Sequence, residues 1–397
     1  AVAVALGARA VLGTGIDPNV ATTIVVGASP GFAPMARVDP GRRGRSRDAL
    51  PDHPKVIWRR PGQTSFDINP IAVDARGSMI APSASLPELV ELASNGTPRW
   101  RASTGFGPSI AGVVILNDGT RFIVTSAGDA VGFSPAGALR FRAPLDLPER
   151  NAKIGLLPLD GGGVAIAAAL TVYELDGDGI PRHRTRLVER IAGAPVSTAS
   201  GLVVTTASGT AYVVREGFAK TVGSLGGDPG EAGASTPDGR TLYAVVDHQR
   251  LVALDLRTGA LDVRFATSDP SLHGPVVFGE RDALVFTTLS GHLLRVDNDG
   301  GALRRTPLEA HIDRPVTDAG RVDFATKDES PVPLTDAAGR VAFARVGGRM
   351  GVVSRDGDLV WIAGPTCSSP AGLVPAGPRR FAVSCRDGTL LLLGDDQ

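Results

Sequence analysis

The chain has 397 residues, of which 43% are hydrophobic, and it contains 50 glycines and 30 prolines. The hydrophobic share is enough for a buried core and excludes a disordered chain, while the many glycines and prolines indicate frequent turns. The 41 basic residues balance the 41 acidic residues, so no net charge is available to attract nucleic acid or an anionic membrane.

The first 54 residues are predicted to form an extended arm. Residues 1–16 are apolar apart from Arg9, and they are shorter than the roughly 20 residues of a membrane span. We interpret them as the remnant of an export signal or of an anchor. Ala21–Val26 is a lone predicted strand, and residues 30–54 are rich in Pro, Gly and Arg, as in a linker or docking arm. We expect this arm to dock on a partner through its arginines Arg37, Arg42, Arg43, Arg45 and Arg47.

From Pro70 onward the sequence repeats one pattern of four short apolar or Thr/Ser/Val-rich runs separated by Gly turns. The period of about 40 residues is typical of propellers, in which each unit forms one four-stranded blade. The pattern predicts an all-β propeller of four-stranded antiparallel blades, eight in number, with seven as the alternative. The first-turn markers of the repeats are Gly77, Gly119, Gly162, Gly201, Gly239, Asp282, Gly339 and Gly377.

The last repeat lacks a fourth strand, which the other end of the chain supplies. The segment at about 55–60, with Val56, Ile57 and Trp58, resembles the outer strands around Trp100 and Trp361. We expect it to pair with the strand that contains Leu391 and to close the ring, which removes two free strand edges. The domain organisation is then an arm over residues 1–54 and a propeller over residues 55–397.

Repeat seven is longer than the others because it contains an insertion, Leu308–Ser330. Insertions in repeat folds usually form loops, often on the binding face. We therefore take Arg321 and Phe324, which lie in this insertion, as candidate partner contacts.

The two cysteines, Cys367 and Cys385, lie in the last repeat on either side of a turn near Gly377. Paired residues of an antiparallel hairpin have a constant sum of residue numbers, and the two cysteines fit the sum expected for this turn. We predict a disulfide between them, worth roughly 3 kcal/mol in the chain-entropy model, and an oxidising compartment. The alternative is a pair of reduced, buried thiols in a cytosolic protein.

Arginines recur on the predicted outer strands, as at Arg99, Arg101, Arg140 and Arg142. Alternate residues of a strand share one face, so each of these pairs projects together at the rim. Charge on an edge strand blocks edge-to-edge association, and we favour this role over an acidic docking surface.

The segment Leu251–Phe265, LVALDLRTGALDVRF, resembles the repeat of quinoprotein-like (PQQ-like) propellers, in which Leu-Tyr-Ala-Leu-Asp is followed by Thr-Gly and a Trp. Weaker copies are Glu88–Gly96 with Trp100, and Leu293–Gly301. In this motif the Gly takes the positive φ of the turn and the aromatic residue packs between blades. The family contains PQQ-dependent dehydrogenases and the cofactor-free periplasmic scaffold BamB, so the resemblance implies the fold and an exported bacterial protein.

The residues favour the scaffold over the dehydrogenase. The quinone enzymes of this family use adjacent cysteines, a Trp and a calcium ion held by carboxylate and amide side chains. Here Cys367 and Cys385 are far apart in sequence, and the three tryptophans fall on predicted outer strands. We therefore expect no catalytic residue, no cofactor and no metal ion.

These observations predict a non-catalytic, protein-binding scaffold in the periplasm or in a bacterial envelope-associated complex. Its partners are proteins, without nucleic acid or a small-molecule substrate, and a membrane is reached through the N-terminus or through a partner. Two alternatives stay open. One is a PQQ- and calcium-dependent dehydrogenase, and the other is a propeller that binds a small ligand or a glycan, for which the 3 Trp and 3 Tyr supply few aromatic candidates.

Overall fold

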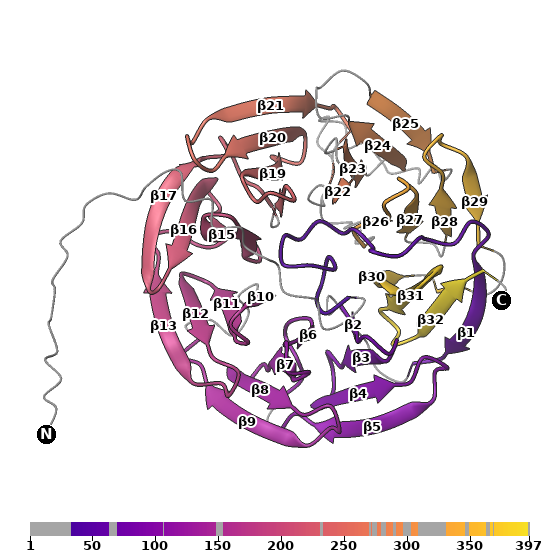
Figure 1. Ribbon diagram of the computed structural model, residues 1–397, viewed down its shortest axis with the longest axis horizontal. Coiled ribbons are helices and arrows are strands. Elements are labelled where there is room, and N and C mark those ends of the chain that lie inside the picture. The colour runs from indigo at the N-terminus through magenta and orange to yellow at the C-terminus, as the bar shows by residue number, and fades with distance from the viewer. Residues whose placement is uncertain are drawn as a thin grey trace, which may run out of the picture.

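A computed structural model shows a closed ring of β-sheets (Figure 1). Within the part of the chain that it describes, every regular element is a strand, and no helix is long and apolar enough to cross a bilayer. The described residues are 33–62, 70–105, 107–147, 154–230, 233–269, 271, 276–278, 283–288, 291–296, 303–308, 331–345, 349–362, 366–367 and 369–395.

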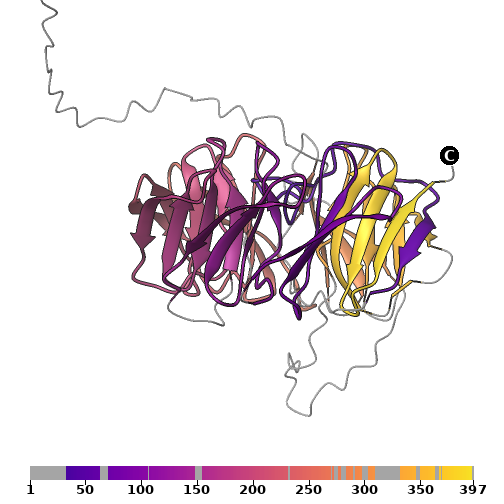
Figure 2. The ribbon, with the colours of Figure 1, turned by 90° about the horizontal axis from the view of Figure 1, so that it is seen from below.

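The strands form eight four-stranded antiparallel sheets, and Figure 2 shows these blades side by side in a flat disc. This confirms the predicted propeller and the count of eight blades over seven. In each blade the strands follow one another from the axis to the rim. Blades 1 to 4 consist of β2 (Ala72–Val73), β3 (Met79–Pro82), β4 (Glu88–Leu92) and β5 (Pro98–Ser103); β6 (Val114–Ile115), β7 (Arg121–Val124), β8 (Asp129–Phe133) and β9 (Leu139–Pro144); β10 (Ile154–Pro158), β11 (Val164–Ala168), β12 (Thr171–Leu175) and β13 (Pro181–Arg186); and β14 (Val196–Thr198), β15 (Gly201–Thr205), β16 (Thr210–Arg215) and β17 (Phe218–Ser224).

The second half of the ring repeats this arrangement. Blades 5 to 8 consist of β18 (Ala234–Ser235), β19 (Thr241–Val246), β20 (Arg250–Asp255) and β21 (Leu261–Ala266); β22 (Val276–Phe278), β23 (Ala283–Thr287), β24 (His292–Val296) and β25 (Leu303–Pro307); β26 (Leu334–Thr335), β27 (Val341–Ala344), β28 (Met350–Val353) and β29 (Leu359–Trp361); and β30 (Pro370–Gly377), β31 (Arg380–Cys385), β32 (Leu390–Gly394) and β1 (Lys55–Arg60).

Blade 8 is closed by the two ends of the chain, as the sequence predicts. Strand β1 pairs antiparallel with β32, with Val56 opposite Leu393 and Trp58 opposite Leu392. The register shifts between Val56 and Trp58, so Ile57 is the extra residue of a bulge and Leu391 lies opposite Arg59. The ring therefore has no free β32 edge.

The core lies between blades, because each sheet buries its two faces against its neighbours. All residues of β3, β7 and β11 are buried, whereas β5 and β9 at the rim are mostly exposed. Phe122, Val124, Val164 and Ile166 belong to one such apolar cluster, which spans blades 2 to 4. The apolar runs of the repeat are therefore the buried strands that pack against the neighbouring blades, and the turn residues connect them.

The third turn of a blade is where the outer strand of the preceding blade makes contact. Gly96 has φ +81°, and a Cβ built on it would lie 3.0 Å from the ring of Trp58. The indole Nε1 of Trp58 donates a hydrogen bond to the carbonyl oxygen of Ser94 at 2.9 Å. Trp100 packs on Gly137 in the same way. The Trp and Gly of the repeat motif are therefore two halves of one interblade contact, and Phe141 and His183 take the aromatic place against Gly179 and Gly217.

A buried charge cluster joins blades 1 and 2. Arg121 is 2% exposed, and its guanidinium lies 2.9 Å from Glu91 and 3.2 Å from Asp74. Arg121 also donates a hydrogen bond to the carbonyl oxygen of Gly119 in its own first turn. Arg99, on the outer strand of blade 1, supplies a second cation to Glu91 at 3.3 Å.

Cys367 and Cys385 form a disulfide, with their Cα atoms 6.2 Å apart. The strand register that we used to predict the bridge is wrong by three residues, because Cys385 pairs with Pro370. The hairpin carries two register shifts, one between Pro370 and Gly372 and one between Pro375 and Gly377, which a count across a regular hairpin leaves out. The bridge still forms because Cys367 lies just before β30, within reach of the end of β31.

Candidate functional site

The arm segment, defined here as Ala33–Pro54, lies across the middle of its own ring and runs outward to β1 (Figure 1). It contacts the innermost strands of five blades through its backbone. Ala33 forms a bridge with Val73 of blade 1, and Arg45 forms one with Thr335 of blade 7. The amides of four inner strands or their flanking residues also donate to arm carbonyls, namely Ile115 to Pro34 at 2.8 Å, Ser197 to Pro40 at 2.8 Å, Ser235 to Gly41 at 2.9 Å and Thr335 to Gly44 at 2.9 Å.

Apolar side chains of the arm segment pack into the core clusters of the ring. Met35 and Leu50 are fully buried, and Val38 is nearly so. Arg37, Val38 and Arg42 have positive φ values of 60°, 73° and 55°, which cost energy in residues with a Cβ and persist only where the surroundings hold them. The ring therefore imposes the conformation of the arm segment.

This placement differs from our expectation that the arginines of the arm lie on a partner. Arg37 and Arg42 are buried, with 7% and 8% of their surface exposed. Arg43 pairs with Asp39 within the arm segment at 3.1 Å, and Arg45 takes part in the bridge to Thr335. Only Arg47 of the five is exposed. The physical reason is that the inner strand edges of the blades offer unpaired backbone groups, and this nearby segment satisfies them.

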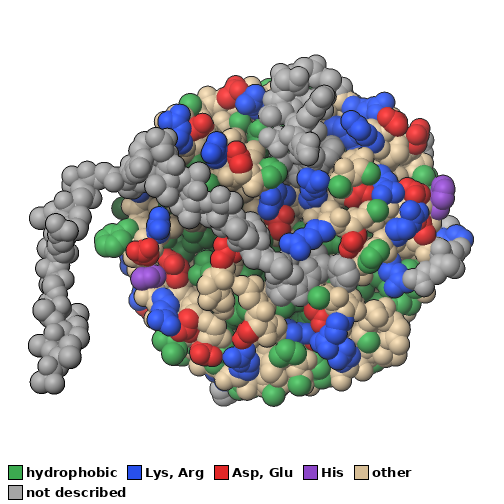
Figure 3. Space-filling model, viewed as in Figure 1, with side chains coloured by type: hydrophobic (Ala, Val, Ile, Leu, Met, Phe, Trp, Pro, Cys, Tyr) green, Lys and Arg blue, Asp and Glu red, His purple; other side chains and the backbone are tan. Residues whose placement is uncertain are grey.

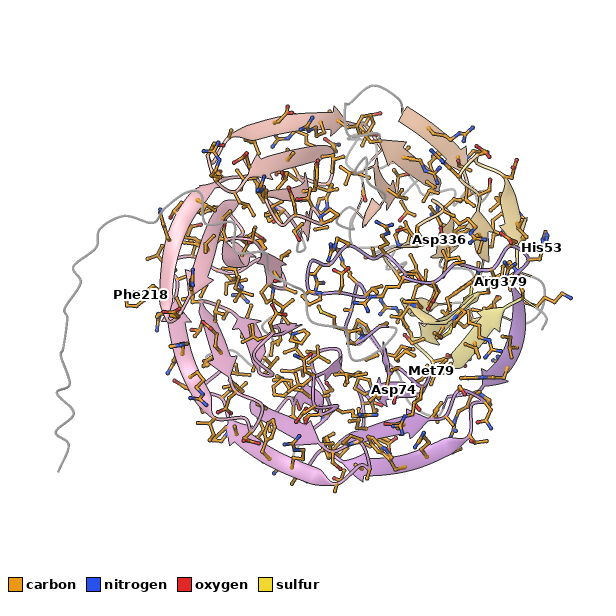
Figure 4. The ribbon with its side chains drawn as sticks, in the orientation of Figure 1. His53, Asp74, Met79, Phe218, Asp336 and Arg379 are labelled. Atoms are coloured by element: carbon orange, nitrogen blue, oxygen red, sulfur yellow. A yellow bond between two sulfur atoms is a disulfide. The ribbon has the colours of Figure 1, made fainter. Side chains whose placement is uncertain are left out.

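Where the arm segment leaves the ring, a chain of alternating charges fastens it to blades 7 and 8. Asp336 is fully buried, accepts a hydrogen bond from the Leu50 amide at 2.8 Å and lies 2.7 Å from Arg340. Arg340 also pairs with Asp52, which lies 2.8 Å from Arg379. The hydrogen bond from Arg340, followed by that from Arg379, lowers the pKa of Asp52. Figure 4 shows Asp336 and Arg379 beside the outward path of the arm segment, with His53 at the rim.

The rim carries a row of exposed apolar side chains that we call the rim row. Its members follow the third-turn glycine by one or two residues in four successive blades, and Figure 4 shows Phe218 pointing away from the ring. Elsewhere on the face seen in Figure 3, acidic and basic side chains are interspersed. The rim row consists of Leu139 (56% exposed), Ile180 (58%), Phe218 (80%) and Leu261 (39%).

The outer strand of blade 4 differs from the other outer strands. β17 has seven residues, FAKTVGS, and contains no arginine. Residues 218–221 are all exposed. Four residues after the third-turn glycine, where blades 1 to 3 have Trp100, Phe141 and His183, β17 has Thr221.

The insertion residues Arg321 and Phe324 lie outside the described residues. Among the residues that the structure describes, no group of three or more His, Cys, Asp or Glu side chains could hold a metal ion. A polar cluster at blade 6 consists of His292, Asp269, Thr288 and Arg305, in which Asp269 accepts a hydrogen bond from Thr288 at 2.6 Å. Burial and Arg305 lower the pKa of His292.

No family model and no curated protein matches this sequence. Solved structures do match its fold. BamB from Moraxella catarrhalis aligns with a TM-score of 0.60 at 16% identity, over 87% of this chain and 98% of that one. The fold is that of a divergent BamB-like propeller. The computationally designed Ika8 protein aligns with a TM-score of 0.65 at 15% identity, over 85% of this chain and 98% of that one.

Virginiamycin B lyase from Staphylococcus aureus also aligns, with a TM-score of 0.52 at 13% identity, over 86% of this chain and all of that one. The same ring therefore carries a protein named as a lyase as well as BamB. Fold alone does not decide between binding and catalysis, so the function has to be argued from the surface of this chain.

Sequence reasoning missed the rim row and the special character of β17. The repeat alignment contained a signal, because the apolar residue after each third-turn glycine and the missing arginine of repeat four are both visible in it. Which outer-strand side chains are exposed depends on what the neighbouring blades leave uncovered, and the repeat alignment does not show this.

Proposed function

We propose that this protein is a non-catalytic, protein-binding scaffold of a bacterial envelope-associated assembly, and that the rim row is the surface that docks its partner. The observation that carries the proposal is the recurrence of an exposed apolar side chain one or two residues after the third-turn glycine in blades 2 to 5, up to the 80% exposed Phe218. Exposed apolar surface marks interaction sites in soluble proteins, and here one such side chain lies at the rim of each of four successive blades.

The arm segment supports a rim surface over an axial ligand site. Small-molecule sites are concave, and here Met35 and Val38 of the arm segment are buried in apolar clusters of the ring. The backbone hydrogen bonds of the arm segment to five blades hold them there. The arm segment thus occupies the inner strands, and the rim is the surface that we assign to the partner.

The export part of the proposal is supported by the Cys367–Cys385 disulfide, since such bridges persist in oxidising compartments. The fold likeness to BamB points in the same direction. The partners are then proteins of the envelope, and the ring serves as a rigid support for them.

The test is an affinity capture from the native envelope fraction with the tagged full chain. A rim variant carries Leu139→Ser, Ile180→Ser and Phe218→Ser, and the matched control is Leu86→Ser, which removes an exposed leucine outside the rim row. Proteins identified by mass spectrometry with the wild type and with the control are expected to be lost with the rim variant. Equal recovery by all three chains would overturn the proposal.

A further inference from the structure

We propose that β17 is an open sheet edge to which the partner adds an extended segment of acidic and apolar residues, so that blade 4 gains a fifth strand. This inference rests on the proposed function and names the kind of partner that it needs. An unpaired edge presents a row of N–H and C=O groups, and extended peptides bind proteins by pairing with such edges.

Most of the other outer strands carry arginine and several carry proline, whereas Lys220 is the one charged side chain on β17. Charged side chains and proline on an edge strand prevent pairing with another chain. Every other described outer strand of five or more residues contains arginine, and β5, β9, β13 and β25 also contain proline. β29 has only three residues. β17 is the longest outer strand, and its one charged residue is Lys220.

Repeat equivalence identifies the position at which protection is missing. The fifth residue after the third-turn glycine is an arginine in blades 1, 2, 3 and 5. In blade 4 this residue is Val222, which is half-buried beside the apolar cluster of blades 4 and 5. Val222 is the extra residue of a bulge, as Arg264 is in blade 5. The protecting residues are Arg101, Arg142, Arg184 and Arg264.

The charge of the edge indicates an acidic partner segment. Arg182 and Arg184 on β13 and Arg264 on β21, the two neighbouring outer strands, each pair with a carboxylate. Within the described part of the chain, Lys220 and Arg186 at the end of β13 have no such partner. A carboxylate of an added strand opposite Lys220 supplies one, and Phe218 offers an apolar contact at the end of the edge.

The same charge disfavours a second copy of this chain as the occupant. Two β17 edges in antiparallel pairing centred on Thr221 place Lys220 of each copy diagonally across from the other. Like charges at this spacing repel, so a partner segment with carboxylates fits better than self-pairing.

The first experiment measures fluorescence anisotropy of a labelled heptapeptide of alternating Val and Glu against the full chain, with an alternating Val and Lys heptapeptide as control. The Val/Glu peptide is expected to bind at least about tenfold more tightly. Val222→Arg, which restores the arginine of the other blades, should weaken this binding, because position 222 is half-buried and an added strand would desolvate the new charge. Val263→Arg, which places the same charge on an exposed residue of β21, should retain it. A chain that does not bind the Val/Glu peptide, or a Val222→Arg chain that binds it as the wild type does, would overturn the inference.

Because Val222 is half-buried, a second variant separates folding from binding. Lys220→Glu changes an exposed side chain, so the melting temperature is expected to stay unchanged while the preference switches from the Val/Glu to the Val/Lys peptide. A preference that does not switch contradicts pairing at β17. Self-association of the wild type that Val222→Arg removes, measured by sedimentation, would identify a second copy as the occupant and overturn the partner assignment.

The envelope capture separates the proposed docking at the rim row from strand addition at β17. Partners lost with the rim variant but retained with Val222→Arg would leave the proposed function in place and overturn strand addition. Partners retained with both variants would overturn both.

Discussion

At the residue scale, two kinds of arginine have to be distinguished. Arg121 is buried between two blades, with Glu91, Asp74 and a carbonyl oxygen as its partners. Arg140 lies at the rim, where its side chain is 34% exposed, and pairs with Asp118. Desolvation makes the loss of one member of a buried pair costly, whereas exposed pairs contribute little.

Replacing Arg121 by Met is therefore expected to lower the free energy of unfolding by about 3–5 kcal/mol, because Glu91 and Asp74 lose their shared cation. Arg140→Met, the matched change at the rim, should cost less than about 1 kcal/mol. Denaturant unfolding of both variants measures the difference. Equal losses would show that burial of Arg121 does not govern the energetics of this cluster.

The disulfide gives a second prediction at this scale. Replacing Cys367 and Cys385 by Ser is expected to lower the free energy of unfolding by about 3 kcal/mol, because the oxidised chain closes a loop of about 18 residues in the unfolded state. The measurement is denaturant unfolding of the oxidised wild type and of the double variant. A wild type whose unfolding midpoint does not move on adding reductant would contradict it.

Residue patterns predicted the partners of the cysteines but not those of the arm arginines. A disulfide joins two named side chains in one hairpin, so spacing was informative even though the bulges at Pro370 and Pro375 shifted the register. Arg37 and Arg42 are placed by their backbone, at positive φ. Their side-chain charge suggested a partner surface, and nothing in the local sequence showed that the axis of the ring would bury them.

At the element scale, the arm segment lies across the ring as a strap, and its carbonyl groups accept hydrogen bonds from amides of the inner strands. Its contacts use main-chain carbonyl groups, which every sequence offers, so composition identified an extended arm without identifying what it contacts. The ring supplies the binding site only when several blades are in place. This is why no short window of the sequence encodes the arm's destination.

A chain starting at Lys55 tests this strap. The amides of Ile115, Ser197, Ser235 and Thr335 donate to arm carbonyls, so their hydrogen exchange is expected to accelerate when the arm segment is removed. Amides within β11, which has no contact with the arm in its pairing pattern, serve as the internal control. Unchanged protection at all four sites would mean that the arm segment is not held at the axis in solution.

The ion pairs of Asp52 with Arg340 and Arg379, which we call the clasp, fasten the arm segment where it leaves the ring. They predict that the stability of the protein depends on pH. Hydrogen bonds from Arg340 and Arg379 lower the pKa of Asp52 in the folded state. A carboxyl group with a lowered folded pKa adds stability above its unfolded pKa of about 4, and this is lost as the pH falls through the folded value. Asp52→Asn should therefore be less stable than the wild type at pH 7, and the two should converge at acidic pH. A constant difference in unfolding free energy from pH 7 to below pH 3 would contradict the clasp.

At the scale of the whole molecule, the ring was largely predictable because one packing unit repeats along the chain. The glycine turns set the blade length, and the missing fourth strand of the last repeat indicated closure by the segment around Trp58, which β1 and β32 confirm. The rim row and the open edge of β17 were not predicted, since exposure at the rim depends on what neighbouring blades leave uncovered. The strands and glycine turns recur in every repeat and can therefore be recognised from the sequence. The outer strand of blade 4 differs from the repeat because it lacks arginine, and a repeat pattern does not predict such an exception.

Closure by β1 is itself testable, by comparing a chain starting at Lys55 with one starting at Gly62. Both lack the arm segment, and only the second lacks β1, which leaves the β32 edge unpaired. Because free strand edges pair with other chains, the shorter chain is expected to self-associate in light scattering while the longer one stays monomeric. A synthetic peptide of residues 52–62 should restore the monomer by pairing with β32, and a peptide of the same composition in scrambled order should not. A shorter chain that remains monomeric and as stable as the longer one would show that the ring does not depend on joining its two ends.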